Sequence, residues 1–580
     1  MRRWGLLLME KSGDGCRIRA DCLILHQLYD IDLKAMKTQR LMKLVAVSLL
    51  VSMTLLTANG QSSRAHRDRY SRANTYGDVV ELRLKDPGTL EEKMPKGMMD
   101  RVRLLHVEGP MDYKDFKFIK SLCNRSRCVD ARDKKIENYI DLELERARIM
   151  SSSNGGLLGG HGDRDVLGDC LSYSSHLRSI MLPERLKRID SDALRGCGQL
   201  EEVIMPVGVR ELGNSAFSGC DRLEYIPLPD GLERIGRECF YGCDNLKTIN
   251  IPRSVTEIVD KAFHGSGLQR VMLPEGLLSL GAKAFNNTSI DMLVIPAGTR
   301  IVNDDLGFMK KLEEIDVVEG SRYYASEDGV LYDNTGRLLL LYPAARKGIF
   351  DVPDGVEQIA PNAFYNSVVE GVRLPESLSI IGEAAFENCA GLTSIALPEG
   401  VSVVLPRTFK HCKNLKDVLF PTALTGIGKE AFEGCALVSI DLPSTLTTLG
   451  ERAFKNCKGL TSVIVPDACT LVGKEAFREC TSLTTIDLGN GITSIGDNAL
   501  RETAISTLVL PQSVTEVGKK VAEKCKLLTL IQCHAVLPPK LDGVSNNKVE
   551  LRVPDASVPA YKSAKNWKNY KNINAITVVE

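Results

Sequence analysis

Cysteine is the residue type in this chain that most readily suggests chemistry, because a thiol can attack a substrate, bind a metal or form a disulfide. The sequence has 17 cysteines. Nine of them stand at one position of a repeated phrase, three residues after a position that is usually Phe: Cys197, Cys220, Cys243, Cys389, Cys412, Cys435, Cys457, Cys480 and Cys525. In other copies that position holds Ser266, Thr288, Ser367 or Thr503. A position that accepts Cys, Ser or Thr selects a small, weakly polar side chain and not a reactive thiol.

These nine cysteines are predicted to form a ladder of buried free thiols. Equivalent side chains of stacked repeats point in parallel directions, which is poor disulfide geometry, and bridges between neighbouring copies are the alternative. Cys469 replaces an apolar residue of the phrase and is interpreted as packing. Cys123 and Cys128, which precede the repeats, could pair in an exported protein. No C-x-x-C or H-x-x-x-H spacing is present, so we expect no metal site.

The other chemical motifs are weak. A nucleophile needs a base and an orienting group, and of the eight His only His411 adjoins one of the nine cysteines. Neighbours at a bend point in different directions, so His411 is interpreted as a surface residue. The stretch from Gly159 to Asp165 resembles a calcium-binding nonapeptide, but Arg164 stands where Asp is needed, which favours a flexible linker. We therefore predict no catalytic residues, no cofactor and no enzyme, unless the region around His106 hides a site.

The feature that organises the chain is the repeated phrase itself. It reads L-P-x-x-L-x-x-I-G-x-x-A-F-x-x-C-x-x-L-x-x-I, has a period of 22 or 23 residues and recurs thirteen times, with a clear copy from Leu442 to Val463. Self-similarity at this period indicates a solenoid. The apolar residues of L-x-x-I-x-L alternate as in a parallel strand, and Pro ends that strand. Gly supplies a tight turn, and Ala-Phe begins a short helical segment whose Phe, such as Phe454, fills the core.

The phrase closely resembles the BspA-like (treponemal-type) class of leucine-rich repeats, known from exported proteins of Bacteroidetes-type bacteria. The resemblance covers residues 170–535, and the segment from Gly329 to Tyr332 and the end from Val553 to Trp567 also resemble that family. It implies an extracellular or surface-exposed binding protein, often an adhesin for host or bacterial surfaces, with no shared catalytic residues.

The predicted fold is an α/β leucine-rich-repeat solenoid with parallel strands, short helical or 3-10 segments opposite them, a small α/β N-terminal cap and a C-terminal cap. The domain boundaries follow the composition. We expect an over-extended start at 1–35, a signal peptide at 36–60, the N-terminal α/β cap at 61–150, a Gly/Ser-rich linker at 151–168, repeats at 169–296, an inserted β-hairpin segment at 297–351, repeats at 352–535 and the C-terminal cap at 536–580.

Charge and targeting signals limit the partners and the location. Lys+Arg and Asp+Glu are both 74, and a net charge of zero argues against a nucleic-acid partner. Lys37, Arg40 and Lys43 precede an apolar run from Leu44 to Leu56, and small residues follow, as in a secretory signal peptide. No later apolar run is long enough to span a membrane. We therefore expect an extracellular or cell-surface protein without a transmembrane segment in the mature chain, with the periplasm as the alternative.

A partner is expected to bind the outward positions of the strands. Interface energy concentrates in Tyr, Arg and other large side chains, and these are commoner in the first half of the array. The predicted contact residues are Glu202, Tyr225, Arg270, Met272, Met292, Tyr323 and Tyr324. A solvated sheet face without a ligand is the alternative for these positions.

The function predicted from the sequence is protein binding by a monomer, as adhesion to or recognition of a host matrix or bacterial surface protein. The alternative is a non-adhesive structural component of the cell envelope that binds other bacterial proteins.

Overall fold

The computed structural model describes residues 78–129, 135, 137–150, 165–543 and 547–576. The chain divides into two units, Met1–Arg72 and Ala73–Glu580. The expected over-extended start, the signal peptide at 36–60 and most of the expected linker lie outside the described residues. Among the residues that the structure describes, no helix has the length and apolar character needed to cross a membrane.

The N-terminal cap is a small parallel sheet with a helix beside it. Its strands are β1 (Val79–Arg83), β2 (Leu104–Met111), β3 (Ile140–Glu143) and β4 (Ala147–Ile149), and its helices are α4 (Leu90–Lys93) and α5 (Tyr113–Cys123). The mixture of strands and helices expected for this cap is confirmed. The side chain of Asp112 caps α5 by accepting from the backbone amides of Lys114 and Asp115. Strand β3 pairs with β6 (Leu177–Met181), so the cap sheet continues into the repeats.

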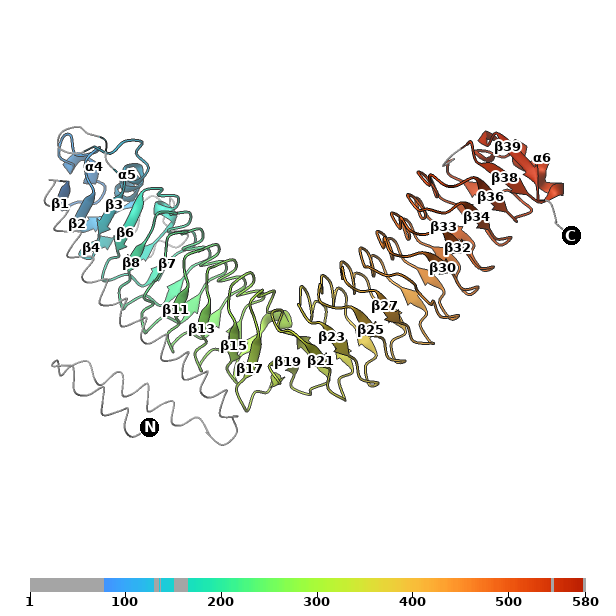
Figure 1. The fold of residues 1–580 in the computed structure, drawn as a ribbon. Helices are drawn as coiled ribbons and strands as arrows, with labels where there is room; N and C mark the ends of the chain where they lie inside the picture. Colours follow the sequence, from blue (N-terminus) through green and yellow to red (C-terminus); the bar gives the residue numbers. More distant parts are fainter. Residues whose placement is uncertain (1–77, 130–134, 136, 151–164, 544–546, 577–580) are drawn as a thin grey trace. The chain divides into compact units, whose positions relative to one another are not determined.

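Each repeat forms one coil, most coils carry two parallel strands, and the coils stack in sequence order (Figure 1). The broad sheet contains the strand predicted from the phrase. In the first half of the array its strands are β6, β8 (Glu202–Ile204), β11 (Thr248–Asn250), β13 (Arg270–Met272), β15 (Met292–Ile295) and β17 (Glu314–Val317). In the second half they are β21 (Ile349–Asp351), β23 (Gly371–Arg373), β25 (Ser394–Ala396), β27 (Asp417–Leu419), β30 (Ser462–Ile464), β32 (Thr485–Asp487), β34 (Thr507–Leu510) and β36 (Leu530–Cys533).

A second, narrow sheet runs along the array and was not predicted. Its strands are only two residues long and end at the apolar residue that precedes the turn. In the first half they are β5 (Val166–Leu167), β7 (Arg188–Ile189), β9 (Glu211–Leu212), β10 (Arg234–Ile235), β12 (Glu257–Ile258), β14 (Ser279–Leu280) and β16 (Arg300–Ile301). In the second half they are β22 (Gln358–Ile359), β24 (Ile380–Ile381), β26 (Val403–Val404), β28 (Gly426–Ile427), β29 (Thr448–Leu449), β31 (Leu471–Val472), β33 (Ser494–Ile495), β35 (Glu516–Val517) and β37 (Lys540–Leu541).

The Ala-Phe segment folds as a run of turns, so the expected one-turn helix in each repeat is wrong. Residues two before and two after the Phe have left-handed backbone, as in Arg452 (φ 57) and Asn456 (φ 62) on either side of Phe454. A right-handed helix cannot include such residues. Alternate amides point to the next coil: Phe454 donates to the Ala476 carbonyl at 2.8 Å, and Asn456 donates to the Arg478 carbonyl at 2.7 Å. Short 3-10 turns occur along the described array at η1 (Asp169–Leu171) and η2 (Val302–Asp304).

The core contains stacked Phe rings, and most coils contribute one of them. We call the position that they occupy the ring position. Phe217, Phe240, Phe263 and Phe285 stack with ring centroids 5.3–5.4 Å apart. A second column runs from Tyr342 and Phe364 to Phe477, and the expected burial of Phe454 is confirmed, with 0% of its surface exposed. Two separate apolar clusters correspond to the two halves of the array.

The predicted hairpin is confirmed between the two halves. Strands β19 (Val330–Asp333) and β20 (Leu338–Leu341) are antiparallel, and β18 (Tyr324–Glu327), which was not assigned from the sequence, pairs with β19. Strand β20 then pairs in parallel with β22, which restarts the narrow sheet.

The C-terminal end is closed by β38 (Glu550–Val553), η3 (Asp555–Ser557), α6 (Val558–Ser563), η4 (Trp567–Asn569) and β39 (Asn572–Ala575). Two strands and a short helix thus lie within the segment predicted as the C-terminal cap. Trp567 is buried and its indole N–H donates to the Pro539 carbonyl at 2.7 Å. These groups cover the apolar end of the last coil, which would otherwise meet water.

Candidate functional site

The outward side chains of the broad sheet form two columns along the first half of the array, which we call the broad face. The strand registers pair Ser179 with Glu202, Thr248 with Arg270 and Met292 with Glu314. The neighbouring column begins with Met181 and Ile204 and continues with the pairs Asn250–Met272 and Val294–Asp316. The first column is therefore mostly polar, with Met292 as its apolar member, and the second is mostly apolar, with Asn250 and Asp316 as its polar members.

Five of the predicted contact residues belong to coils of the broad face. Glu202 is on β8, Arg270 and Met272 are on β13, and Met292 is on β15. Tyr225 stands in the coil between β8 and β11, where no strand is assigned. Met272 is 45% exposed and the other four are half-buried. Partial burial raises the pKa of the Tyr225 hydroxyl above its usual value, so this side chain stays neutral near neutral pH.

The two hairpin tyrosines differ from each other. Tyr324 is only 5% exposed, and its hydroxyl accepts from the Ile301 amide at 3.0 Å. It ties the hairpin to β16, so the expectation that it is an exposed contact residue is wrong. Tyr323 is half-buried, with its ring centroid 6.2 Å from that of Tyr324. The sequence could not separate the two because they are adjacent and both aromatic.

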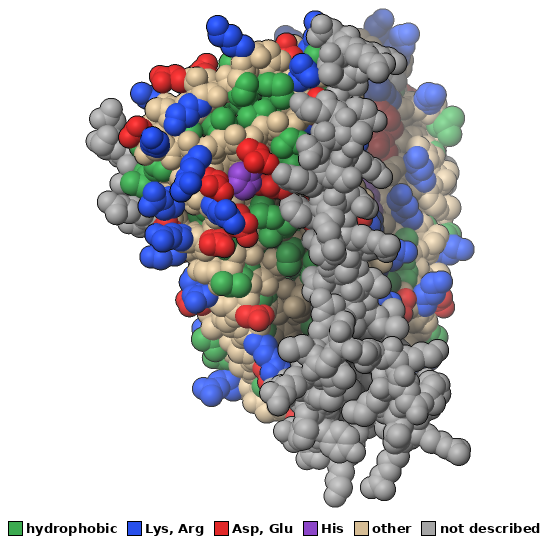
Figure 2. All heavy atoms as spheres, turned by 90° about the vertical axis from the view of Figure 1, so that its left-hand side faces the viewer, with side chains coloured by type: hydrophobic (Ala, Val, Ile, Leu, Met, Phe, Trp, Pro, Cys, Tyr) green, Lys and Arg blue, Asp and Glu red, His purple; other side chains and the backbone are tan. Residues whose placement is uncertain are grey.

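The cap adds a polar cluster to the same sheet, which the sequence analysis missed. His106 lies between two carboxylates, with Nδ1 3.1 Å from Glu143 and Nε2 3.3 Å from Glu108. The hydrogen bond from His106, aided by Arg146, holds the pKa of Glu108 below its usual value. Alternating polar residues on β2 and β3 are the only sequence signal for this cluster. On the side seen in Figure 2, basic, acidic and hydrophobic side chains are interspersed, as the net charge of zero leads one to expect.

The second half of the array presents a plainer surface with a few protruding aliphatic side chains. Leu419 and Ile464 are 68% and 69% exposed on the broad sheet, and Val509 is 40% exposed. Asp441 and Asp487 occupy the coils between them. Ser462 and Thr485 are also exposed, so this half combines small polar side chains with isolated aliphatic ones.

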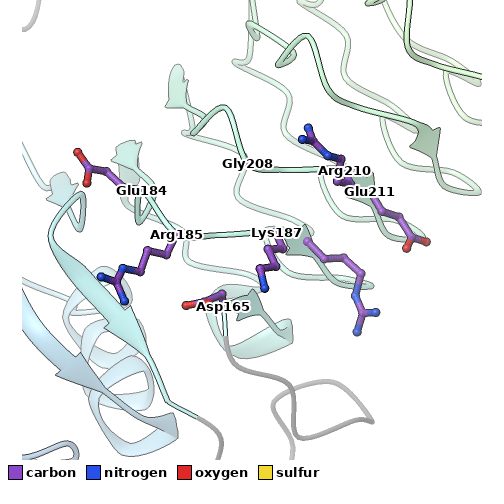
Figure 3. A pocket seen from close by; sticks show the side chains of 8 residues that line it. Asp165, Glu184, Arg185, Lys187, Gly208, Arg210 and Glu211 are labelled. Atoms are coloured by element: carbon purple, nitrogen blue, oxygen red, sulfur yellow. The ribbon is translucent and has the colours of Figure 1, made fainter.

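A shallow groove of about 660 Å³ lies beside the narrow sheet near its N-terminal end and is rich in charge (Figure 3). Arg185, Lys187 and Arg210 line it together with Asp165 and Glu184. Figure 3 shows the side chains of Arg185 and Arg210 directed to different sides of the groove. The cations therefore do not converge on one point, and nearby acids balance them, so the groove is not built to hold an anion.

The nine repeated cysteines are buried and free, as predicted. Each thiol lies within hydrogen-bonding distance of the carbonyl at the ring position of the preceding coil, at 3.0–3.3 Å, for example Cys457 to Phe432 and Cys480 to Phe454. Burial raises the pKa of Cys457 to about 12. A Ser or Thr can replace such a thiol because a hydroxyl can also donate to a carbonyl.

Other cysteine chemistry finds little support in the geometry. Cys123 and Cys128 are both free, and the Cys128 sulfur accepts from Arg125 at 3.2 Å. Cys469 is fully buried in the core, as interpreted. Within the described ranges, no group of three or more His, Cys, Asp or Glu side chains is placed to hold a metal ion.

Parallel coils of this length, most of them with a broad strand and all around an apolar interior, define a leucine-rich-repeat solenoid. A family model described as "BspA type Leucine rich repeat region" matches residues 166–291, 348–461 and 452–538, which is just over half of the chain. The protein belongs to this family. No sequence among the curated proteins matches the chain.

Several solved structures are similar to this chain. A leucine-rich repeat protein from Eubacterium ventriosum is 21% identical over 58% of this chain and 81% of its own, with a TM-score of 0.44. A leucine rich cell surface protein from Faecalibacterium prausnitzii is 25% identical over 54% of this chain and 79% of its own, with a TM-score of 0.36. A leucine-rich repeat protein from Bacteroides ovatus is 22% identical over 69% and 92%, with a TM-score of 0.35.

The thiol ladder makes a direct prediction about reactivity. In the chain from Gln61 onward at about pH 8, Ellman's reagent should not react with the nine repeated thiols until a denaturant is added, because a buried thiol with a raised pKa forms almost no thiolate. Ser462→Cys, at an exposed position, should react within minutes as the positive control. Rapid labelling of Cys457 in the folded protein, or a mass showing a disulfide between neighbouring coils, would contradict this arrangement.

Proposed function

We propose that the protein is exported and binds another protein at its broad face, for adhesion to or recognition of a host or bacterial surface. The observation that carries the proposal is the pair of columns on the first half of the broad sheet. One column offers Tyr225 and Arg270 as large anchors, and the other offers Met272 and neighbouring apolar groups. Protein interfaces combine such anchors with an apolar centre and a polar rim.

The architecture supports the same proposal. Successive coils are about 4.8 Å apart, so seven coils give a continuous face roughly 30 Å long. The backbone amides of the broad sheet are already paired between coils. A partner would therefore contact side chains and would not add a strand to the sheet.

Export rests on the signal-like segment at 36–60, which precedes the described residues. Membership of the repeat family supports the proposal that the protein binds another protein, but it does not identify that partner. A non-adhesive envelope component that binds other bacterial proteins would use the same face, so location and partner must be measured separately.

The binding surface can be tested with paired variants. The purified protein is screened against immobilised host matrix proteins and against extracted bacterial surface proteins. For any partner found, Tyr225→Ala combined with Arg270→Ala should weaken binding by about 100-fold, because two central anchors are lost. The matched control is Ser462→Ala combined with Thr485→Ala on the same sheet in the second half, which should leave the affinity unchanged. Unchanged affinity of the first pair would place the contact elsewhere.

Location is tested on intact cells that express the protein. An external protease should remove the protein while a periplasmic control protein survives, because a surface protein is accessible from outside. If the protein survives together with the control, adhesion is excluded, and a partner inside the envelope should be sought instead.

A further inference from the structure

A cavity of about 590 Å³ lies where the hairpin interrupts the array, away from the outward columns of the broad face. Leu306 and Tyr342, which hold successive ring positions, both line it. Before the hairpin, Lys283 donates to the Asp305 carbonyl and Asn287 to the Phe308 carbonyl, both at 2.7 Å, so these two turns are bonded to each other. The next such bond is from Tyr342 to Ala363, at 2.8 Å. The hairpin separates these turns, and the space between them is the cavity.

The apolar part of the lining differs from the rest of the turn side. Phe308 stands two residues after the ring position, where Gly219, Gly242, Asn388 and Asn456 stand in other coils. Its ring meets that of Tyr365 edge to face, with centroids 5.8 Å apart and an angle of 89°. Leu338 and Leu341 also line the cavity and are only partly buried. A half-buried aromatic pair beside partly exposed leucines is a surface that a ligand with an apolar side could cover.

The polar part of the lining is neutral overall. Lys283 is paired with Asp305 at 3.4 Å, and Arg407 is paired with Glu383 at 2.6 Å and lies 3.9 Å from Glu387. Each cation therefore has a carboxylate partner. The side chains of Asn303 and Asn362 add exposed amides at the rim, and each amide can both donate and accept.

This lining selects a class of ligand. An anion or a cation would meet paired charges of both signs, and a purely apolar molecule would leave the amides of Asn303 and Asn362 without partners. A sugar ring has hydroxyl groups at its edge and C–H groups on its faces, so it can use amides, carboxylates and aromatic rings at once. Ligand sites usually have volumes of about 300–1,000 Å³. We propose that this cavity binds a neutral carbohydrate of one or two sugar units.

The test uses the chain from Gln61 onward and a panel of neutral mono- and disaccharides: glucose, galactose, N-acetylglucosamine, lactose, maltose and chitobiose. Saturation-transfer NMR detects weak binding, and titration calorimetry measures it. At least one of these sugars should bind, and Tyr365→Ala should weaken that binding by at least tenfold. Asn362→Gly should weaken it several-fold without backbone strain, because Asn362 has a φ of 59° that Gly adopts readily.

The control variant is Tyr241→Ala. Tyr241 directly follows the ring residue Phe240, as Tyr365 follows Phe364, but it does not line the cavity and stacks on His264 instead. The Tyr241→Ala variant should bind the sugar as tightly as the unchanged protein does. Thermal melts of the three variants show whether each one is folded. Absence of binding by every sugar at millimolar concentration would overturn the proposal. Unchanged binding by both Tyr365→Ala and Asn362→Gly would overturn it as well, since the sugar would then lie elsewhere.

Discussion

The fold depends on how the turn segment of each coil bonds to the next coil. Left-handed residues two before and two after the ring position turn alternate amides outward along the array, where carbonyls of the following coil accept them. The same geometry places one Phe ring above the next and brings each thiol onto the carbonyl of the preceding ring residue. The residue before the ring stays small, as in Ala453 and Ala476, because its carbonyl must be reached by the neighbouring amide. The same turn geometry therefore buries the ring and pairs the backbone amides and carbonyls in hydrogen bonds.

At the hairpin, the turn segments of successive coils are no longer bonded and stacked in this regular way. Leu306 fills the ring position before the hairpin and Tyr342 fills it afterwards, and the apolar core divides there into two clusters. The narrow sheet ends at β16 and restarts through the pairing of β20 with β22, while the turn side opens into a cavity. The hairpin segment therefore interrupts core packing and leaves a lined cavity. The regular coils differ from it because side chains fill their interior.

Much of the fold could be predicted because the same residue pattern recurs in many repeats. A position that is ambiguous in one copy can be assigned from the others. The broad strands, the buried thiols, the position of Phe454 and the hairpin all follow from periodicity and residue type. The helical turn could not be excluded, because Arg452 and Glu475 give no sign of left-handed backbone, and only contacts with the next coil stabilise that conformation. The narrow strands are too short to show alternation. Tyr324 and Phe308 were misjudged or overlooked because burial of a single aromatic depends on the neighbouring coil, which the local sequence does not describe.

The central claim is that the stacked ring, held in place by coil-to-coil bonds, supplies the stability of the array. It is tested most directly by urea unfolding of Phe454→Ala in the chain from Gln61 onward, followed by the fluorescence of Trp567, the single tryptophan of that chain. The account predicts a loss of about 3–5 kcal/mol in the free energy of unfolding. Phe454→Leu, which copies the residue that fills this position at Leu306 and Leu500, should lose only about 1 kcal/mol. A loss below about 1 kcal/mol for Phe454→Ala would contradict the account.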